Sequence, residues 1–384
     1  MERNEKIKVL QVAGRMDVGG IENQLMHLIR NADKSRFQLD YTTTDRHPFY
    51  EDEIVALGGA CIHIPGTNGR QLLRYCRSLY RVLKEGNYDV VHSHELFHSG
   101  LVVFTAKLAG VKHRFVHAHS SNQQLGKSLA RRAYTAVMRR LILRFGTEFF
   151  ACSSLAGEFL YGRKTLKKPN YHLVVNSVET ACFLPDKDAE ARPADPDGWR
   201  TVLQVGRFRD EKNFLFTTQI AAECKKRGDR IRFRFVGNDG SDNPYERAVT
   251  RSIEENGLRD TVRLLGVRKD VSELMKQADA FLLPSKYEGM PLTLIEAQAA
   301  GLPCVSADTF SHEVDFGLDQ IQWLKLSDPI SAWADAVETA AARNRVPRDR
   351  LETAVREKGF DVKRFAETLC GLYQAAVCGE GPRS

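Results

Sequence analysis

Residues 284–303 read PSKYEGMPLTLIEAQAAGLP and follow a short apolar run, Ala280 to Leu283. Four apolar residues that end at a proline predict a buried strand. Pro291 predicts the start of a helix, at a position where its missing N–H costs nothing. Gly301 predicts the left-handed cap that ends this helix, and Pro303 prevents it from continuing. The stretch therefore predicts a strand, a loop and a helix in succession, which is the repeating unit of an α/β fold.

The same alternation extends over the rest of the chain. Runs rich in β-branched and aromatic residues predict strands at 8–13, 37–43, 61–64, 89–92, 114–117 and 148–152, and then at 201–205, 232–236, 262–264, 280–283 and 303–306. Amphipathic patterns predict helices at 21–30, 71–84, 99–108 and 128–145. Strands that alternate with helices of this length predict right-handed βαβ units and parallel sheets.

A polar stretch with several Pro and Asp residues, Leu184 to Trp199, interrupts this alternation. It predicts two tandem Rossmann-like, doubly wound α/β domains joined by a linker. We place the first domain at 1–180, the linker at 181–200, the second domain at 201–359, and a C-terminal helix that crosses back to the first domain at 360–384. Ligands of such sheets bind at the carboxyl ends of the strands, so we expect the active site in a cleft between the domains.

The composition is that of an ordinary globular protein. The 384 residues are 42% hydrophobic and 27% charged, which argues against disorder and against a polytopic membrane protein. The eight scattered cysteines include no C-x-x-C pair, so we expect reduced thiols in a cytoplasmic protein rather than disulfides or a zinc site. The first residues run directly into a strand, and we expect no signal peptide.

Basic charge is concentrated in the first half. Residues 1–180 contain 26 Lys and Arg against 16 Asp and Glu, and no acidic residue lies between Glu95 and Glu148. Within that stretch, residues 127–145 predict a helix with apolar residues at helical spacing and arginines at the other positions. Such a helix can lie on anionic lipid head groups, or it can pack on the core with a solvated basic face. Charge alone is compatible with nucleic acid, an anionic membrane or a phosphate-bearing substrate as partner.

The predicted helix that begins at Pro291 has free backbone N–H groups near Leu292 and Thr293, and a helix N-terminus of this kind suits a phosphate. Glu288 lies in the loop before it and Glu296 about one turn inside the helix. Carboxylates repel phosphate but accept hydrogen bonds from hydroxyl groups. The arrangement therefore favours a phosphate-bearing ligand with a ribose on one side and a sugar on the other.

The spacing of Glu288 and Glu296 resembles the E-x7-E element of the retaining glycosyltransferases of family 4, which have the GT-B fold, and the surrounding P-S-x-x-E-G-x-P pattern resembles theirs as well. The likeness extends over essentially the whole chain and is greatest to members that build bacterial exopolysaccharide, capsule and lipid-linked oligosaccharides. It implies that Glu296 holds the ribose of a nucleotide sugar and that Glu288 lies beside the donor sugar. It also implies substrate contacts from the rest of this block, namely Gly289, Met290, Leu292 and Thr293.

A second block, VGRFRDEKN at 205–213, follows the first strand of the second half. An Arg and a Lys five positions apart can converge on one diphosphate. By the same resemblance, this G-R-x-x-x-x-K pattern neutralises the leaving nucleoside diphosphate, and we assign Gly206, Arg207 and Lys212 to that role. Asn238, in a glycine-rich turn, and Arg268, in a segment similar to the one that packs on the base, complete the predicted nucleotide site.

In the first half, residues 14–22 (GRMDVGGIE) form a glycine-bearing turn before a predicted helix and lack the G-x-G-x-x-G pattern of dinucleotide-binding proteins. The resemblance implies that Gly19, Gly20 and Glu22 approach the donor phosphates and the acceptor.

His117 and His119 end the fifth predicted strand and share one side of it. A metal site at this pair, or at His92 and His94, lacks a nearby third ligand. By the resemblance, His119 lies over the reacting sugar and His117 supports it. We expect His92 and His94 to be core residues or to lie behind the site.

Together these features predict a retaining glycosyltransferase that needs no metal or cofactor, with His119, Arg207, Lys212 and Glu288 as catalytic residues. We expect it to move a sugar from a UDP-linked donor to a lipid-linked saccharide, at the inner face of a membrane. One alternative is a nucleotide-sugar epimerase of the same fold, which the two sequence blocks disfavour. Another is a non-catalytic nucleic-acid-binding protein that uses the basic half. Because that half lacks interleaved aromatic residues, we expect no nucleic-acid partner.

Overall fold

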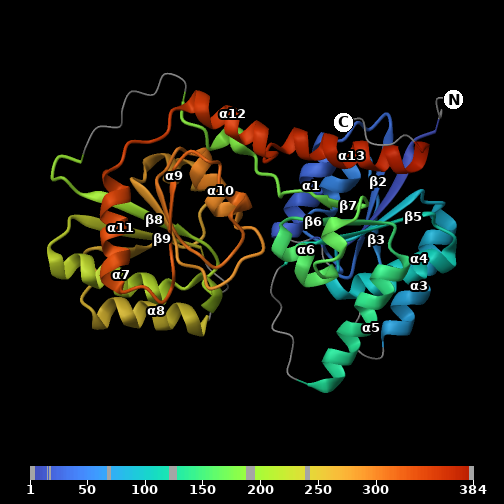
Figure 1. The fold of residues 1–384 in the computed structure, drawn as a ribbon, viewed down its shortest axis with the longest axis horizontal. Coiled ribbons are helices and arrows are strands. Elements are labelled where there is room, and N and C mark those ends of the chain that lie inside the picture. The colour runs from blue at the N-terminus through green and yellow to red at the C-terminus, as the bar shows by residue number, and fades with distance from the viewer. Residues whose placement is uncertain are drawn as a thin grey trace. The chain divides into compact units, whose positions relative to one another are not determined.

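A computed structural model describes residues 5–14, 16, 19–66, 71–120, 128–186, 195–237 and 243–379. The chain divides into two compact units (Figure 1). The first combines Met1–Ser177 with Asp361–Ser384, and the second is Val178–Phe360. Each unit has its own parallel sheet, as the alternation of strands and helices predicted.

The first unit is built on a seven-stranded sheet with the order β3-β2-β1-β4-β5-β6-β7. Its strands are β1 (Ile7–Val12), β2 (Phe37–Thr43), β3 (Cys61–His63), β4 (Val90–Ser93), β5 (His113–Ala118), β6 (Glu148–Ala151) and β7 (Tyr171–Leu173). Its helices are α1 (Gly20–Asn31), α2 (Glu51–Ala56), α3 (Leu72–Gly86), α4 (Ser99–Ala109), α5 (Leu129–Phe145), α6 (Ser154–Tyr161) and α13 (Val362–Cys378).

Strand β1 lies inside this sheet, between β2 and β4, and alternates its side chains between two cores. Val9 belongs to the core that α1, α2 and α13 cover, and Leu10 to the core that α3 and α4 cover. Both side chains are fully buried, because a parallel sheet of this kind has helices on both faces. Helix α13 packs beside α1, so the end of the chain completes the first core (Figure 1).

The second unit is built on a six-stranded sheet with the order β10-β9-β8-β11-β12-β13. Its strands are β8 (Arg200–Val205), β9 (Ile231–Val236), β10 (Val262–Leu264), β11 (Ala280–Leu283), β12 (Cys304–Ala307) and β13 (Ile321–Leu324). Its helices are α7 (Phe214–Arg227), α8 (Pro244–Glu255), α9 (Val271–Gln277), α10 (Leu292–Ala299), α11 (Ile330–Ala342) and α12 (Arg348–Lys358).

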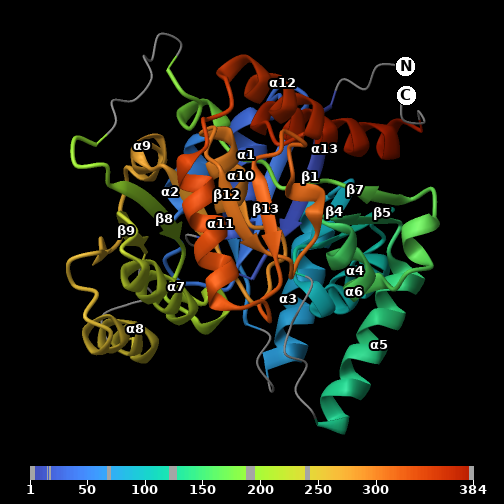
Figure 2. The same cartoon turned by 60° about the vertical axis from the view of Figure 1, so that its left-hand side comes forward.

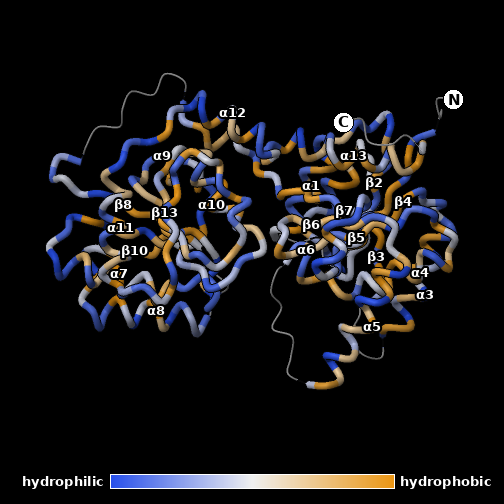
Figure 3. Tube along the Cα trace, viewed as in Figure 1, coloured by the Kyte–Doolittle hydropathy of each residue, from blue (hydrophilic) through white to orange (hydrophobic). Residues whose placement is uncertain are grey.

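The core of the second unit lies under helices α7 and α11, which pack on each other and on the sheet (Figure 2). Trp333 of α11 is fully buried there and packs edge-on against Phe216 of α7. Apolar residues follow the strands of both sheets, and polar residues the outer loops (Figure 3). Within the described ranges, no helix is both long and apolar enough to span a bilayer.

All eleven predicted strands form, but β7 and β13 were not predicted. Both are edge strands with partly exposed residues. Short, half-exposed edge strands lack the continuous apolar run that identifies a buried strand of a parallel sheet, and this explains why the sequence pattern missed them.

Candidate functional site

In the second unit, two loops that follow neighbouring strands lie against each other. One follows β8 and runs from Gly206 to Asn213, and the other follows β11 and runs from Pro284 to Pro291. The Asn213 side chain donates to the Pro284 carbonyl over 3.0 Å, and the Lys286 backbone N–H donates to the Glu211 carbonyl over 2.8 Å. The two sequence blocks that were predicted to share a site are therefore in direct contact.

An ion pair between Lys212 and Glu288 lies at the centre of this contact. The Lys212 Nζ is 2.6 Å from the Glu288 Oε1, and the two side chains are 18% and 12% exposed. The Coulomb attraction within an ion pair shielded from water in this way is stronger than in a fully exposed pair, although burying the two charges also costs free energy. Arg207 is exposed, and within the described ranges its only hydrogen bond is made by its backbone carbonyl, which accepts from the Arg209 N–H over 2.8 Å.

Helix α10 begins at Leu292, with Pro291 as its N-cap, so the start lies one residue later than predicted. Gly301 has φ of 75°, which confirms its predicted left-handed conformation. The hydroxyls of Thr293, near the start of α10, and of Ser285, in the preceding loop, are buried without a hydrogen-bond partner among the described residues. Buried hydroxyls normally have such partners, so these two are suited to bind a ligand.

Glu296 lies in α10, one turn after its start, and is partly buried. Burial raises the pKa of its carboxyl from 4.5 to about 7, and the nearby Lys212 charge opposes this only in part. Raised carboxyl pKa values are common where a protein holds a carboxylate ready for a ligand. Met290 is buried beside the same helix, and Gly289 is half-buried.

Three glycines meet at the carboxyl ends of β8, β9 and β10. The Gly237 N–H donates to the Gly266 carbonyl over 2.9 Å, and a Cβ at Gly237 would collide with the Gly206 carbonyl. Gly237 also has φ of 130°, which side chains rarely permit. Arg268 is exposed, and its guanidinium forms a two-pronged ion pair with the Asp270 carboxylate. Asn238 lies outside the described residues.

In the first unit, α1 begins after Gly19, which is its N-cap, and Gly20 is its first residue. The Glu22 carboxylate folds back so closely that a Cβ at Gly19 would collide with it. A carboxylate in the first turn of a helix is stabilised by the partial positive charge of the helix N-terminus. The structure thus places all three residues together at the end of the loop that follows β1.

Four histidines gather where β4 and β5 end, because these strands pair in parallel with His92 opposite Phe115. The rings of His117 and His119 are 4.1 Å apart, and those of His92 and His94 are 4.4 Å apart. Burial lowers the pKa of all four rings, that of His119 to about 3. All four histidines are therefore neutral at pH 7.

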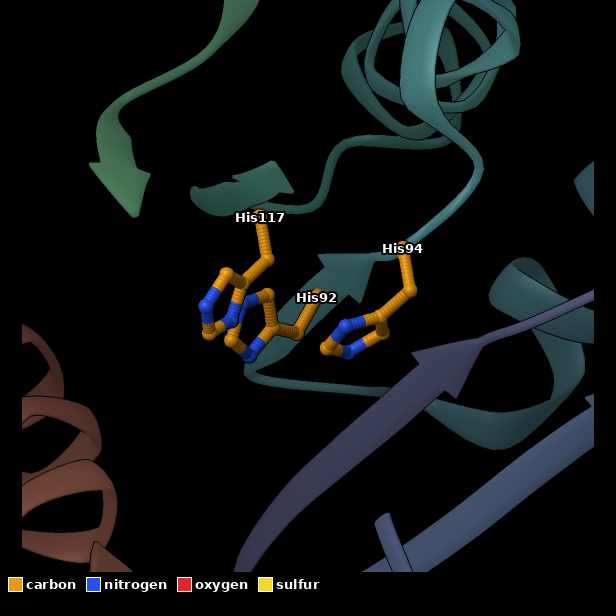
Figure 4. A group of neighbouring side chains, drawn as sticks. All are labelled: His92, His94 and His117. Carbon is orange, nitrogen blue, oxygen red and sulfur yellow. The ribbon is translucent and has the colours of Figure 1, made fainter. Parts of the chain in front are cut away.

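The expectation that no third ligand lies near a histidine pair was wrong. His92, His94 and His117 each offer a nitrogen, and these atoms all lie within 4.8 Å of one another (Figure 4). The pairing of β4 with β5 creates this proximity, which the linear order of the residues conceals. Both nitrogens of His94 are already engaged in hydrogen bonds, so His94 would have to give one up to bind a metal.

The sequence patterns did not single out Glu95, which follows His94 directly. Its Oε2 accepts a hydrogen bond of 2.6 Å from the Tyr75 hydroxyl, and burial raises the pKa of its carboxyl to about 7. Glu95 also lines a cavity of about 240 Å³ together with Arg131 and Tyr134 of α5. Its position at the end of a predicted strand, next to the His-x-His pattern, was the signal that could have identified it.

Helix α5 buries only two of its residues, Met138 and Ile142. Leu129 and Val137 are 80% and 54% exposed, although both are apolar. Arg139 differs from the other arginines of α5 because it donates to the carbonyls of Phe159 and Leu160 and so ties α5 to α6.

Comparison with known proteins identifies the family to which the chain belongs. Residues 19–177 match the family described as "Glycosyl transferase 4-like domain", and residues 186–358 match "Glycosyl transferases group 1". The chain is 34% identical over 378 residues to a Bacillus subtilis (strain 168) protein described as "Putative glycosyltransferase EpsF". The match covers 96% of this chain and 97% of that protein.

Two further relatives are less similar. The capsular polysaccharide biosynthesis glycosyltransferase CapH of Staphylococcus aureus is 28% identical, over 76% of this chain and 78% of its own. The Escherichia coli UDP-Gal:alpha-D-GlcNAc-diphosphoundecaprenol alpha-1,3-galactosyltransferase is 27% identical, over 59% of this chain and 60% of its own.

Among solved structures, the fold is similar to that of Anabaena Alr3699/HepE in complex with UDP and glucose. The TM-score is 0.74 at 16% identity, and the match covers 96% of this chain and all of the other. The likeness confirms the predicted GT-B fold class of two parallel-sheet α/β domains.

Proposed function

Because the chain belongs to the glycosyltransferases that combine a 4-like domain with a group 1 domain, we propose that it transfers a sugar from a UDP-linked donor to a lipid-linked saccharide, with retention of configuration, in the synthesis of an exopolysaccharide or capsule. The names of the relatives EpsF and CapH support the class of product. The UDP donor and undecaprenol-linked acceptor named for the Escherichia coli relative support the substrates.

The observation that carries this proposal is the Lys212–Glu288 ion pair, which joins the loop after β8 to the loop that leads into α10. Beside it lie a helix N-terminus, the carboxyl of Glu296 and the Thr293 hydroxyl, which has no hydrogen-bond partner among the described residues. Backbone N–H groups and a cation suit a diphosphate, and a carboxylate suits the two hydroxyls of a ribose. One nucleoside diphosphate can use all of these groups at once.

In the proposed reaction, the bond between the sugar and the diphosphate breaks and the sugar passes through an oxocarbenium-like state. Arg207, Lys212 and the N-terminus of α10 stabilise the charge that develops on the leaving diphosphate, which is the largest catalytic contribution expected. The acceptor oxygen bonds to the anomeric carbon on the face that the diphosphate leaves, while the leaving phosphate accepts the proton of the acceptor hydroxyl, and the configuration is retained. Glu288 and His119 lie beside the sugar in this proposal.

Because cationic side chains and backbone N–H groups can neutralise the leaving group, we propose that the reaction needs no metal ion. Further residues are proposed to contact the substrates. They are Gly19, Gly20, Glu22, His117, Gly206, Asn238, Arg268, Gly289, Met290 and Leu292.

The lipid-linked acceptor calls for a position at the inner face of a membrane, and α5 supports this part of the proposal. Its exposed surface combines Leu129 and Val137 with Arg131, Arg132 and Arg140. Apolar residues next to basic ones suit the interface of an anionic bilayer.

The test is hydrolysis of UDP-, GDP- and ADP-sugars by the purified protein, with water as acceptor. Release of UDP together with the α-anomer of the sugar is the expected result. Sugar epimerised at the ring would identify the epimerase alternative. No turnover of any donor, combined with tight nucleic-acid binding, would identify the non-catalytic alternative.

A further inference from the structure

A chain of hydrogen bonds leads from His119 into the core of the first unit. The His119 Nε2 lies 2.8 Å from the His94 Nδ1, and the His94 Nε2 lies 2.8 Å from the Gln11 Oε1. The amide nitrogen of Gln11 donates to the Tyr373 hydroxyl over 2.9 Å, and this hydroxyl lies 2.7 Å from the His92 Nδ1. The chain thus connects β1, β4 and the end of β5 to helix α13.

The amide of Gln11 determines the position of each proton, because its nitrogen only donates and its oxygen only accepts. The oxygen accepts the proton on the His94 Nε2. Burial keeps His94 neutral, so its Nδ1 has no proton and accepts one from the His119 Nε2. His119 is neutral for the same reason, and its Nδ1 therefore has a free lone pair.

The same orientation of the Gln11 amide sets the proton at the other end of the chain. The Tyr373 hydroxyl accepts from Gln11, so it donates its own proton to the His92 Nδ1. The His119 Nδ1 is buried and has no hydrogen-bond partner in the described part of the chain. A buried acceptor without a partner is costly unless a ligand uses it.

We propose that Tyr373, Gln11 and His94 are positioning residues that hold His119 in its Nε2–H tautomer, so that its Nδ1 accepts a hydrogen bond from a hydroxyl group of the bound sugar. The assignment of the sugar rests on the proposed function. The tautomer itself does not.

In the wild type, the Tyr373 hydroxyl is the acceptor of the Gln11 amide nitrogen and lies next to the His92 Nδ1. Without it, the Gln11 amide nitrogen faces no acceptor, and the amide can turn over so that its nitrogen donates to the His94 Nε2. Each proton then moves to the other nitrogen of its ring, and His119 presents an N–H in place of a lone pair. The Tyr373 ring packs on Phe115 with 5.7 Å between the ring centroids, so Tyr373→Phe removes the hydroxyl while this packing remains.

The experiment is NMR of the full chain with ring-labelled histidine, whose carbon and nitrogen shifts distinguish the two neutral tautomers. The His119 signal is identified by its loss in His119→Asn. We expect a single Nε2–H tautomer in the wild type and a mixture in Tyr373→Phe. Tyr41→Phe is the matched control, because Tyr41 is buried in the same core and donates only to the Leu25 carbonyl.

A second variant, Gln11→Met, removes the amide with little change in shape and should also give the mixture, which keeps the proposal testable if Tyr373→Phe fails to fold. An Nδ1–H tautomer of His119 in the wild type overturns the proposal. So does an unchanged His119 signal in the folded variants.

Donor hydrolysis separates this proposal from the proposed function. In Tyr373→Phe, turnover should fall by about twofold to tenfold, the factor that corresponds to one net hydrogen bond. Tyr41→Phe should keep wild-type turnover. A mixed tautomer with unchanged turnover supports the positioning of His119 by Tyr373 and removes His119 from the reaction.

Discussion

Replacing Glu296 with glutamine should make the free protein more stable while it weakens nucleotide binding. Burial raises the pKa of this carboxyl from 4.5 to about 7. At about 1.4 kcal/mol per pKa unit, ionising Glu296 costs roughly 3 kcal/mol more in the folded protein than in the unfolded chain. Some solvent reaches the side chain, so the effect in solution should be about 1 to 3 kcal/mol.

The sign depends on pH. Below pH 4.5 the carboxyl is protonated in both states and costs nothing. Between pH 4.5 and about 7 the unfolded chain loses the proton first, so the stability of the wild type falls, and above pH 7 the full penalty applies. The glutamine side chain has no such penalty. Glu296→Gln should therefore be about 1 to 3 kcal/mol more stable than the wild type at pH 8, and less than about 1 kcal/mol more stable at pH 5.

Denaturant unfolding of both proteins at the two pH values measures this difference, with the exposed Glu255→Gln in the same unit as control. Calorimetry should show that the variant binds UDP about tenfold or more weakly, because hydrogen bonds from ribose hydroxyls to a charged carboxylate are stronger than those to an amide. Equal pH dependence of stability in variant and wild type would refute the cost of burial. Unchanged UDP affinity would refute the ribose contact.

Four further outcomes are expected. Arg207→Ala should reduce donor hydrolysis by about 10² to 10³, the effect of losing one preorganised charge-stabilising group, and near wild-type turnover would remove Arg207 from the site. Activity should survive EDTA, whereas strict dependence on Mg²⁺ or Mn²⁺ would contradict leaving-group stabilisation by protein cations alone. Gly237→Ala should lower the free energy of unfolding by about 1 to 3 kcal/mol, because the positive φ and the Gly206 carbonyl both oppose a side chain, and an unchanged denaturation midpoint would contradict this. Replacing Arg131, Arg132 and Arg140 with glutamine, while leaving the structural Arg139 in place, should weaken binding to anionic vesicles at low salt. Each charge contributes about 1 kcal/mol, so the partition coefficient measured by sedimentation should fall by roughly 10². Sedimentation equal to that of the wild type would show that α5 does not dock on lipid.

Local chemistry explains what the sequence predicted well. The left-handed Gly301 and the helix that begins beside Pro291 follow from backbone conformations that only Gly and Pro favour. The buried central strands follow from apolar runs such as Ala280–Leu283, since a parallel sheet covered by helices on both faces requires them. The edge strands β7 and β13 have only half of this pattern, and they were missed.

The sequence by itself also indicated which residue types form the proposed nucleotide-sugar site, because the E-x7-E and G-R-x-x-x-x-K patterns each follow a single strand, β11 and β8. Only the tertiary structure decided which of these side chains touch. Lys212 and Glu288 are 76 positions apart and meet because β8 and β11 are neighbours in the sheet.

The histidine cluster shows even more clearly which features the sequence predicts and which depend on the tertiary structure. His92, His94, His117 and His119 could be found from the sequence, but the short distance between the two pairs comes from the pairing of β4 with β5. The Tyr373 hydroxyl that completes their hydrogen bonds comes from α13, 362 positions after Gln11. Backbone conformation depends on neighbours along the chain, so a local sequence pattern can predict it. The partner of a buried polar group depends on which distant segments pack together, and no local pattern predicts that.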